Sequence, residues 1–412
     1  MLPKSFVYTD DFLLIYMEES FMEQSNWIHR KRHLRVLHIM SGFGGGISSF
    51  IQNKAEQMLQ YNVQFDVLTY DDCSSTFIEA IQATGGDVYK LINPKTQGWR
   101  AFYKSYTNVL KTYKYDAIHC HINGYRTLPY WLISKKYHTQ SFYVHAHQTY
   151  KQPNMTTKAK VRMLINQQVD RLVSDAFLGC GAKAINDVYG FVPKNDMMII
   201  PNSINLKEYN FTKSQIKQFR NEHRKEFNLS DDEFVIGFIG RLMPVKNHSF
   251  VFKLVRYMID NNLPGKVLIV GSGKLEKKLK EEVKQKGLTN RIQFTGRLVP
   301  MSEYYPMFDV LILPSLVEGL PTIAVEAQAI GVPLLMSDEI TKEVDFNLGL
   351  IDYLSLNTDF DVWYQSLVRL AHHSKASKEE RFAKIESEKF TNEKSAELYV
   401  KFLLGEISHY HL

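Results

Sequence analysis

The sequence predicts an α/β protein made of two Rossmann-like, doubly wound domains that face each other across a cleft. Apolar strand patterns alternate with helical patterns from Leu34 onward, which is typical of parallel sheets wrapped by helices. A polar stretch rich in Lys and Arg, residues 205–233, interrupts this alternation once. The 412 residues exceed one ordinary core and suit two domains of roughly 200 residues each.

The first domain is predicted over residues 34–204. It opens with an apolar strand at 34–40, followed by glycines and by a helix whose apolar positions recur at intervals of three and four from Ile47. Because strands that are buried on both faces read as continuous apolar runs, we expect a parallel sheet. The further strands are expected at residues 63–70, 116–122, 142–147, 176–180 and 197–200.

The second domain is predicted over residues 205–380, with the boundary at the start of the polar stretch. Its strands are expected at residues 234–239, 266–270, 291–294, 310–313 and 332–336. Residues 381–412 are predicted as a C-terminal helical segment that returns to the first domain. Residues 1–33, which end in a basic run, are interpreted as an N-terminal appendage, with a solvated leader favoured over a membrane-surface anchor.

Charge and cysteine content narrow the classes of partner and compartment. The net charge of +6 favours anionic partners, but the basic residues are dispersed and no nucleic-acid-binding signature is found, which excludes nucleic acid. The chain has 3 cysteines without a metal-binding or disulfide spacing, which suits the cytoplasm. No apolar run reaches the roughly 18 to 20 residues of a membrane-spanning helix, and no cleavable signal is recognised.

Glycines stand between the first strand and the first helix of the first domain, at Gly42 and residues 44–46. Gly45 and Gly46 therefore allow a ligand oxyanion to approach backbone amides at the positive end of a helix. A tight turn without a ligand remains the alternative. In the second domain, three residues that follow strands are expected on one sheet edge, along which a nucleotide would lie: Gly271, Gly296 and Leu298.

Two cations, Arg241 and Lys246, follow the first strand of the second domain. In an open α/β sheet, ligands bind beyond the carboxyl ends of the strands. The planar fork of Arg241 and the point charge of Lys246 would together grip a diphosphate and stabilise it as a leaving group. The alternative is a pair of solvated surface cations.

The segment 314–327 carries two glutamates eight positions apart, Glu318 in a loop and Glu326 inside a helix. Pro321 suits the first turn of that helix. Both carboxylates can accept hydrogen bonds in pairs, Glu318 from sugar hydroxyls and Glu326 from a ribose diol, whereas the alternative is a buried helix cap. The free amides expected to face a phosphate are those around Gly319, Leu320 and Thr322.

Four histidines form two His-x-His pairs at successive strand ends, His119 with His121 and His145 with His147. Alternation along a strand places both members of a pair on one side of the sheet. His147 lies farthest toward the cleft and is interpreted as a hydrogen-bond partner or proton handler for the ligand. A zinc site is the alternative, but its usual spacing with a carboxylate or cysteine is absent, so no metal ligand is predicted.

Together the glycine loop, the strand-end histidines, Gly-Arg-x4-Lys-Asn at 240–247 and Glu-x7-Glu at 318–326 resemble family 4 retaining glycosyltransferases of the GT-B fold. The resemblance covers nearly all residues from 34 onward. Residues 318–327 and 337–341 are similar to the bacterial capsule and exopolysaccharide branch. The better-known members have Glu-Gly-Phe-Gly-Leu-Pro, so this chain lacks two residues before the proline, which affects Gly319 and Leu320.

The resemblance implies roles for the matching residues. Arg241 and Lys246 would bind the donor diphosphate, Glu326 the ribose and Glu318 the donor sugar, while His147 would contact the sugar near its reactive carbon. The anomeric configuration would be kept, and no metal cofactor is expected because cations and helix amides neutralise the departing charge. Asp359-Phe360-Asp361 is not interpreted as a metal motif, because capping at a helix start explains it better.

The expected substrates are a nucleotide diphosphate sugar, with UDP as the expected carrier of a hexose or N-acetylhexosamine, and a glycan or lipid-linked oligosaccharide acceptor. The chain is then expected in the cytoplasm, with peripheral association at the inner face of the plasma membrane. Three other functions remain as alternatives: a nucleotide-sugar epimerase of the same fold, an inactive partner subunit of a transferase, and an NAD-dependent oxidoreductase. The missing GxGxxG and ribose-binding acid tell against the last.

Overall fold

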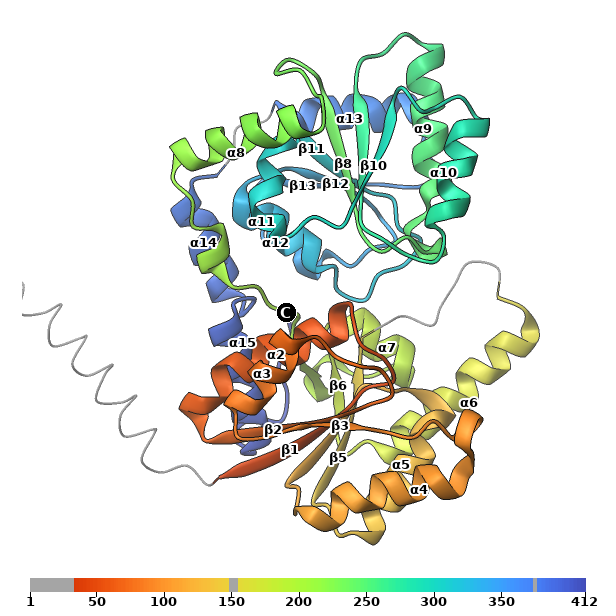
Figure 1. Cartoon of the computed structure of the whole chain (residues 1–412), viewed down its shortest axis with the longest axis vertical. Helices are drawn as coiled ribbons and strands as arrows, with labels where there is room; N and C mark the ends of the chain where they lie inside the picture. Colours follow the sequence, from red (N-terminus) through yellow and green to blue (C-terminus); the bar gives the residue numbers. More distant parts are fainter. Residues whose placement is uncertain (1–32, 148–154, 373–375) are drawn as a thin grey trace, which may run out of the picture.

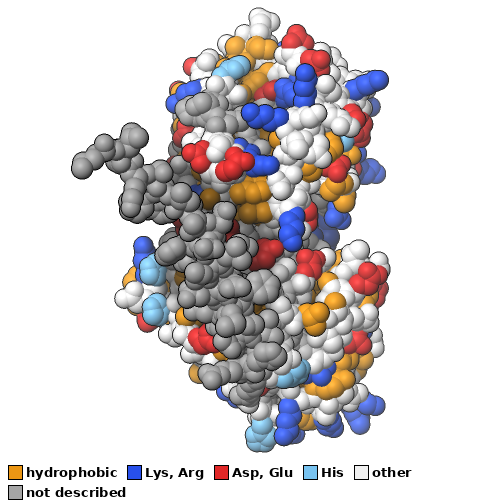
Figure 2. Space-filling view, turned by 90° about the vertical axis from the view of Figure 1, so that its left-hand side faces the viewer, with side chains coloured by type: hydrophobic (Ala, Val, Ile, Leu, Met, Phe, Trp, Pro, Cys, Tyr) orange, Lys and Arg blue, Asp and Glu red, His pale blue; other side chains and the backbone are white. Residues whose placement is uncertain are grey.

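The computed structural model describes residues 33–147, 155–372 and 376–412, and shows two lobes stacked along the long axis of the molecule (Figure 1). Each lobe contains one parallel sheet with helices on both faces, so the predicted fold class is confirmed. The predicted appendage falls almost entirely on residues 1–32, which lie outside the described residues. Acidic and basic side chains are interspersed on the visible part of the side that carries α14 and α15 (Figure 2).

The first sheet has the strand order β3-β2-β1-β4-β5-β6-β7, in which all pairs are parallel. This is the order of a Rossmann fold, and it places a topological switch point between β1 and β4. Two clusters of buried apolar side chains fill the two faces. The strands are β1 (Leu34–Ile39), β2 (Val63–Thr69), β3 (Val88–Lys90), β4 (Ala117–Cys120), β5 (Ser141–Ala146), β6 (Phe177–Gly179) and β7 (Met197–Ile199).

Helices cover the first sheet in two groups. On one face α2 (Gly46–Met58) contacts both α3 (Ser75–Ala83) and α15 (Asn392–Leu403). The other face is covered by α4 (Pro94–Thr112), α5 (Leu128–Lys136), α6 (Thr157–Val173) and α7 (Ala182–Tyr189). Figure 1 shows the first group between the sheet and the second lobe, with α4 and α5 on the far side.

The second sheet repeats the same plan in the order β10-β9-β8-β11-β12-β13, with its switch point between β8 and β11. The strands are β8 (Val235–Ile239), β9 (Lys266–Val270), β10 (Ile292–Gly296), β11 (Val310–Leu313), β12 (Leu334–Ser337) and β13 (Ile351–Leu354). The helices are α8 (Lys213–Glu226), α9 (His248–Asp260), α10 (Glu276–Gln285), α11 (Met301–Tyr304), α12 (Thr322–Ile330), α13 (Phe360–Ala371) and α14 (Lys378–Ser387).

Two edge strands were not predicted, β3 in the first sheet and β13 in the second. The residues of β3 are half-buried or exposed and those of β13 are half-buried, so neither shows the continuous apolar run used to recognise buried strands. The strand expected at 332–336 begins only at Leu334, because Gly331 ends α12 in a turn with a φ of 83° and residues 332–333 connect it to the strand.

The chain passes between the lobes twice, and the two crossings are joined. Ile204 donates its amide to Phe390 and accepts from the amide of Asn392 through backbone hydrogen bonds of 2.9 and 3.0 Å. Farther along, Tyr410 exchanges backbone hydrogen bonds with Met197 and Ile199 beside β7, at 2.9 and 2.8 Å. Residues beyond α14 therefore complete the edge of the first sheet.

Candidate active site

The loops at the switch point of the second sheet carry most of the candidate residues. Arg241 and Lys246 follow β8, while Glu318 follows β11, the neighbouring strand. Two hydrogen bonds hold these loops together, from the Leu316 amide to Val245 at 2.8 Å and from Asn247 Nδ2 to Pro314 at 3.1 Å. Ligands of open α/β sheets bind beyond the carboxyl ends of the strands at the switch point, which is where these loops lie.

Lys246 and Glu318 form an ion pair, with Nζ 2.6 Å from Oε1. The same carboxylate oxygen accepts a hydrogen bond of 2.7 Å from the hydroxyl of Ser315. The two side chains are only 13% and 15% exposed, so their charges lie in a partly desolvated place where electrostatic forces are stronger than in water. Lys246 has three N–H donors, and therefore retains donors for a further anion.

Arg241 is exposed and reaches the glycine loop of the other lobe. A carbon added as Cβ at Gly44 or Gly45 would lie 3.4 or 3.5 Å from Nη2 of Arg241. Both glycines have positive φ, 94° and 84°, a conformation that other residues rarely adopt. The Gly44 amide donates to Ser48 Oγ at 2.9 Å, so Gly45 and Gly46, at the start of α2, hold the amides that a ligand would meet.

A second contact between the lobes joins Gly319 to the end of β5. A Cβ at Gly319 would lie 2.2 Å from the backbone oxygen of His147, so only glycine permits this approach. Beside it, Asn202 Nδ2 donates to the backbone oxygen of Leu320 at 3.0 Å. The loop that contains Glu318 is therefore held directly against the histidine-bearing strand ends of the first lobe.

Glu326 lies on α12, which begins at Thr322. Pro321 occupies the N-cap and not the first turn, which corrects the predicted position by one residue. One carboxylate oxygen of Glu326 accepts a hydrogen bond from the hydroxyl of Tyr305. Burial raises the pKa of Glu326 above its usual value, and the Tyr305 hydrogen bond opposes that rise. Among the residues that the structure describes, none donates a hydrogen bond to the other oxygen, which can therefore meet a ligand.

The glycine-bearing strand ends meet as a short row. The amide of Gly271, after β9, donates to the oxygen of Gly296, at the end of β10, with a distance of 2.7 Å. A Cβ at Gly271 would lie 2.1 Å from the backbone oxygen of Gly240, so this row also packs on the loop that carries Arg241. Leu298 is half-buried and packs against the main core.

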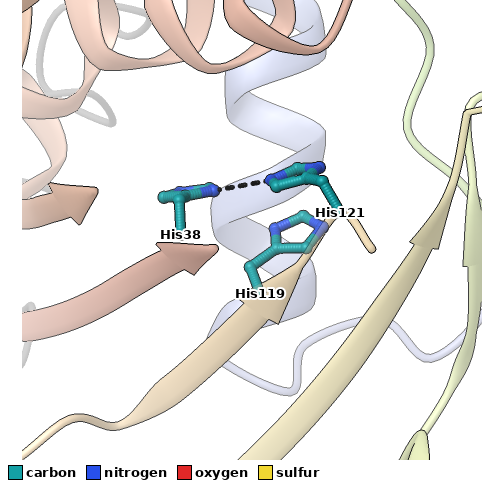
Figure 3. Close-up of side chains that lie close together, drawn as sticks. All are labelled: His38, His119 and His121. Atoms are coloured by element: carbon teal, nitrogen blue, oxygen red, sulfur yellow. Dashed lines mark hydrogen bonds between the residues drawn. The ribbon is translucent and has the colours of Figure 1, made fainter. Parts of the chain in front are cut away.

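The histidines gather under α2 on one face of the first sheet. His38 on β1 joins the predicted set, because the register places it beside His119 (Figure 3). His38 Nδ1 lies 3.0 Å from His121 Nε2, and His121 Nδ1 lies 2.7 Å from His147 Nε2. Desolvation lowers the pKa of His38 and of His147 to about 3, which keeps both rings neutral at physiological pH.

Two overlapping groups could hold a metal ion, His38 with His119 and His121, and His121 with His145 and His147. Neither group includes a carboxylate or a thiol, so a divalent ion would bring its full charge into a buried place.

Asp359 stands at the N-cap of α13 as predicted. Its side chain makes no cap hydrogen bond, which corrects the predicted explanation by capping. Asp361 accepts a hydrogen bond of 3.2 Å from Tyr257.

The structure adds residues that the sequence did not single out, Ser315, Tyr305 and Lys54. Ser315 lies three positions before Glu318 and so belongs to the same loop, a signal that was available. Tyr305 reaches Glu326 from another element, and no local pattern indicates that contact. Lys54 of α2 is fully buried and donates to Ser203 Oγ at 3.1 Å, beside the crossing between the lobes.

Residues 219–345 match the family model of glycosyl transferases group 1. The chain is 29% identical to a putative glycosyltransferase, EpsF, of Bacillus subtilis over 349 residues, which is 84% of this chain and 90% of that protein. It is 30% identical over 185 residues to the UDP-Gal:alpha-D-GlcNAc-diphosphoundecaprenol alpha-1,3-galactosyltransferase of Escherichia coli, covering 44% of this chain and 46% of that enzyme.

Among solved structures, Anabaena HepE in complex with UDP and glucose superposes with a TM-score of 0.68 and 14% sequence identity, covering 90% of this chain and all of that one (100%). WaaG, a glycosyltransferase involved in lipopolysaccharide biosynthesis, superposes with a TM-score of 0.61 at 14% identity over 90% of this chain and 100% of that one. The matched family segment contains Arg241, Lys246, Glu318 and Glu326.

Proposed function

The chain is a glycosyltransferase with two Rossmann-like domains in the GT-B arrangement, and from that premise we propose that it uses a nucleotide diphosphate sugar as donor. UDP is the proposed carrier of a hexose or N-acetylhexosamine. The observation that carries the proposal is the Lys246–Glu318 ion pair at the switch point, held against the end of β5 and beside Arg241. In a nucleotide diphosphate sugar, the cation can bind the diphosphate and the adjacent carboxylate can accept hydrogen bonds from the sugar hydroxyls.

Each proposed contact follows from the charges present. Arg241 offers a planar fork to the diphosphate, and Lys246 offers its remaining N–H donors from the same loop. As the bond to the sugar breaks, negative charge grows on the diphosphate, and both cations stabilise it, as do the amides at Gly45 and Gly46. Glu318, which is fixed by Lys246 and Ser315, accepts hydrogen bonds from the sugar hydroxyls.

We further propose a retaining reaction that requires no metal, in which the acceptor hydroxyl attacks on the face from which the diphosphate leaves. The resemblance of residues 240–247 and 318–326 to family 4 enzymes supports this stereochemistry. The acceptor is proposed to be a glycan or a lipid-linked oligosaccharide in capsule or exopolysaccharide synthesis. The name of the Escherichia coli relative, which states a diphosphoundecaprenol-linked acceptor and UDP-Gal, supports this class of substrates.

A donor screen tests the proposed function directly. The purified chain is incubated with each of several UDP-, GDP- and ADP-sugars, with and without a lipid-linked oligosaccharide, and free nucleotide diphosphate is measured. We expect one UDP-sugar to release UDP, faster when acceptor is present, together with a lengthened glycan. A change of stereochemistry in the free nucleotide sugar would instead identify an epimerase, and the absence of any turnover would identify an inactive subunit.

Glu326→Gln is expected to weaken UDP binding by about 10-fold to 100-fold, because a neutral amide replaces an ionised acceptor of the ribose diol. The amide can still accept one hydrogen bond from Tyr305, so folding should be preserved. Calorimetric titration with UDP measures the change. Glu281→Gln, on the exposed side of α10, is the matched control. Equal UDP affinity in the Glu326→Gln variant and the parent would contradict the assigned ribose contact.

We also propose that the chain associates peripherally with an anionic membrane through α6. The described residues contain no helix long and apolar enough to cross a membrane. On α6, however, Val161, Leu164 and Ile165 are 51%, 55% and 55% exposed, and the acidic residue of this helix, Asp170, is buried. Its exposed charges are basic, including Lys158 and Arg162. Basic and apolar side chains on one helix are typical of membrane-surface helices.

The double variant Leu164→Asp/Ile165→Asp is expected to lower binding to vesicles at least tenfold, because burying each of these side chains contributes about 1.5–3 kcal/mol. Flotation with phosphatidylglycerol-containing vesicles measures the bound fraction. Leu59→Asp, which is also exposed but lies next to α2, serves as the control and should bind as the parent does. Equal flotation of parent and double variant would exclude α6 as the membrane-binding surface.

A further inference from the structure

Histidines of the first sheet form a hydrogen-bonded series that reaches the contact between the lobes at Gly319. It runs from His38 through His121 to His147, and each link joins two ring nitrogens, at 3.0 and 2.7 Å. His38 and His121 are buried, whereas His147 is half-buried at the end of β5, beside Gly319 of the other lobe. A separate series links Tyr399, His119 and His145, at 2.6 and 2.9 Å.

Neutral imidazole has one N–H donor and one acceptor nitrogen. Burial lowers the pKa of His38, His121 and His147, so each ring carries a single hydrogen. A ring that donates through Nδ1 must therefore accept through Nε2. Only two arrangements satisfy both links: all three hydrogens on Nδ1, or all three on Nε2.

The buried end of the series distinguishes these arrangements. Among the residues that the structure describes, Nε2 of His38 has no hydrogen-bond partner. If all hydrogens stood on Nε2, this atom would be an N–H donor without an acceptor, on a buried ring whose centroid lies 4.3 Å from that of Phe65. Buried N–H groups without an acceptor are rarer than acceptors without a donor. The arrangement with hydrogens on Nδ1 is therefore favoured.

We propose that His38 and His121 are positioning residues that hold His147 in the tautomer with its hydrogen on Nδ1, so that His147 meets the donor sugar as a hydrogen-bond donor. This rests on the proposed function for the identity of the ligand. His147 donates its Nδ1 hydrogen to a sugar or leaving-group oxygen, and its Nε2 lone pair is occupied by His121.

The same series excludes His147 as a general base. If a proton were taken up at His147 and passed inward through His121, an imidazolium would form at His38, which is fully buried. If the proton stayed on His147, the two N–H donors of that ring would conflict with the hydrogen already donated by His121. His147 therefore binds and orients through a neutral ring and does not remove the proton of the acceptor.

NMR of isotope-labelled histidine tests the tautomer in the full chain without any substrate. Correlations between ring nitrogens and ring protons distinguish the two neutral tautomers and the imidazolium, and a His147→Gln sample assigns the His147 signals. We expect His38, His121 and His147 in the Nδ1–H form at about pH 7.5, with His147 still neutral at about pH 5.5, one unit below the ordinary histidine pKa. An Nε2–H form or an imidazolium at His147 would overturn the proposal.

Two variants of His121 separate positioning from a merely structural role. His121→Asn keeps an amide donor near the position of Nδ1, whereas His121→Phe removes it. We expect His147 to remain in the Nδ1–H form in His121→Asn and to become a mixture of tautomers in His121→Phe. His119→Phe, which is also buried and lies two positions earlier but belongs to the other series, is the control and should leave the His147 signals in place.

Activity and metal binding complete the test. With the donor found by the screen, His121→Phe is expected to lower kcat at least tenfold, and His121→Asn to recover most of that loss. The tautomer could be as proposed while kcat is unchanged in His121→Phe. In that case His121 does not act as a positioning residue, but the nucleotide-sugar donor identified by the screen is unaffected. If Zn²⁺ instead shifts the His38 and His121 signals in a one-to-one titration, the cluster is a metal site and the proposal is overturned.

Discussion

Lys246→Ala is expected to lower kcat/KM by about 100-fold to 1000-fold, the usual cost of removing a group that stabilises charge in the transition state. Lys246 is held 2.6 Å from Glu318, so the substitution removes a cation from the diphosphate and also frees the carboxylate that faces the sugar. Glu318 keeps its hydrogen bond from Ser315, which limits the structural change. Release of UDP from the donor identified by the screen measures the loss.

Two comparisons make the Lys246 result specific. Lys277→Ala removes an exposed lysine from α10 and should retain the parent rate. Lys246→Arg keeps the positive charge but replaces the compact ammonium group with a planar guanidinium group. We expect a rate between those of the parent and Lys246→Ala. A Lys246→Ala variant that folds as the parent does and retains more than one third of its rate would contradict the role assigned to the second-domain switch point.

Acid is expected to destabilise the first domain steeply. Four of its histidines, His38, His119, His121 and His145, are 0–3% exposed, and desolvation lowers the pKa of each. The unfolded chain has the ordinary histidine pKa of about 6.5 and binds more protons than the folded chain below it. Stability is therefore complete above about pH 6.5 and is lost as the pH falls from there toward the lowered folded values.

The size of this effect follows from linkage. Each histidine that takes up a proton on unfolding contributes about 1.4 kcal/mol over the two pH units centred on its unfolded pKa, so four of them remove about 5 kcal/mol between about pH 7.5 and 5.5. That is comparable with the whole stability of an ordinary domain, about 5–15 kcal/mol. Guanidinium unfolding followed by circular dichroism at several pH values measures the slope.

Single substitutions identify the groups responsible for the acid effect. His38→Phe should reduce the stability lost between about pH 7.5 and 5.5 by about 1.4 kcal/mol, even if the variant is less stable at every pH. His138→Asn removes an exposed histidine whose φ of 57° suits asparagine, and should leave the slope unchanged. If His38→Phe and the parent showed the same slope between about pH 7.5 and 5.5, protonation of His38 would not drive the loss.

Local sequence patterns predicted the positions of residues that directly follow the central strands. Arg241, Lys246 and Glu318 are up to 77 positions apart, yet each follows a central strand of the second sheet, and the Rossmann plan alone indicates that they lie at one switch point. The two sheets themselves were predicted because their central strands are continuous apolar runs. The edge strands β3 and β13 were missed for the converse reason, since half-buried strands lack such runs.

Contacts that depend on strand register could not be predicted. Alternation predicted that His119 and His121 share a face, but only the pairing of β1 with β4 brings His38 next to His119. In the same way, Tyr305 reaches Glu326 from another element through tertiary packing. Such contacts depend on which residues of separate elements stand opposite each other, and the sequence pattern of either element does not contain that information.

The hydrogen bonds between Tyr410 and β7 impose an order on biosynthesis. Ribosomes release the first domain before the second, and domains generally fold as they emerge. Here, however, the outer partner of β7 and the helix α15 that covers α2 are translated only after the whole second domain. During synthesis the first domain therefore has an unpaired sheet edge and an exposed apolar face. It can complete its folding only after the second domain has been synthesised.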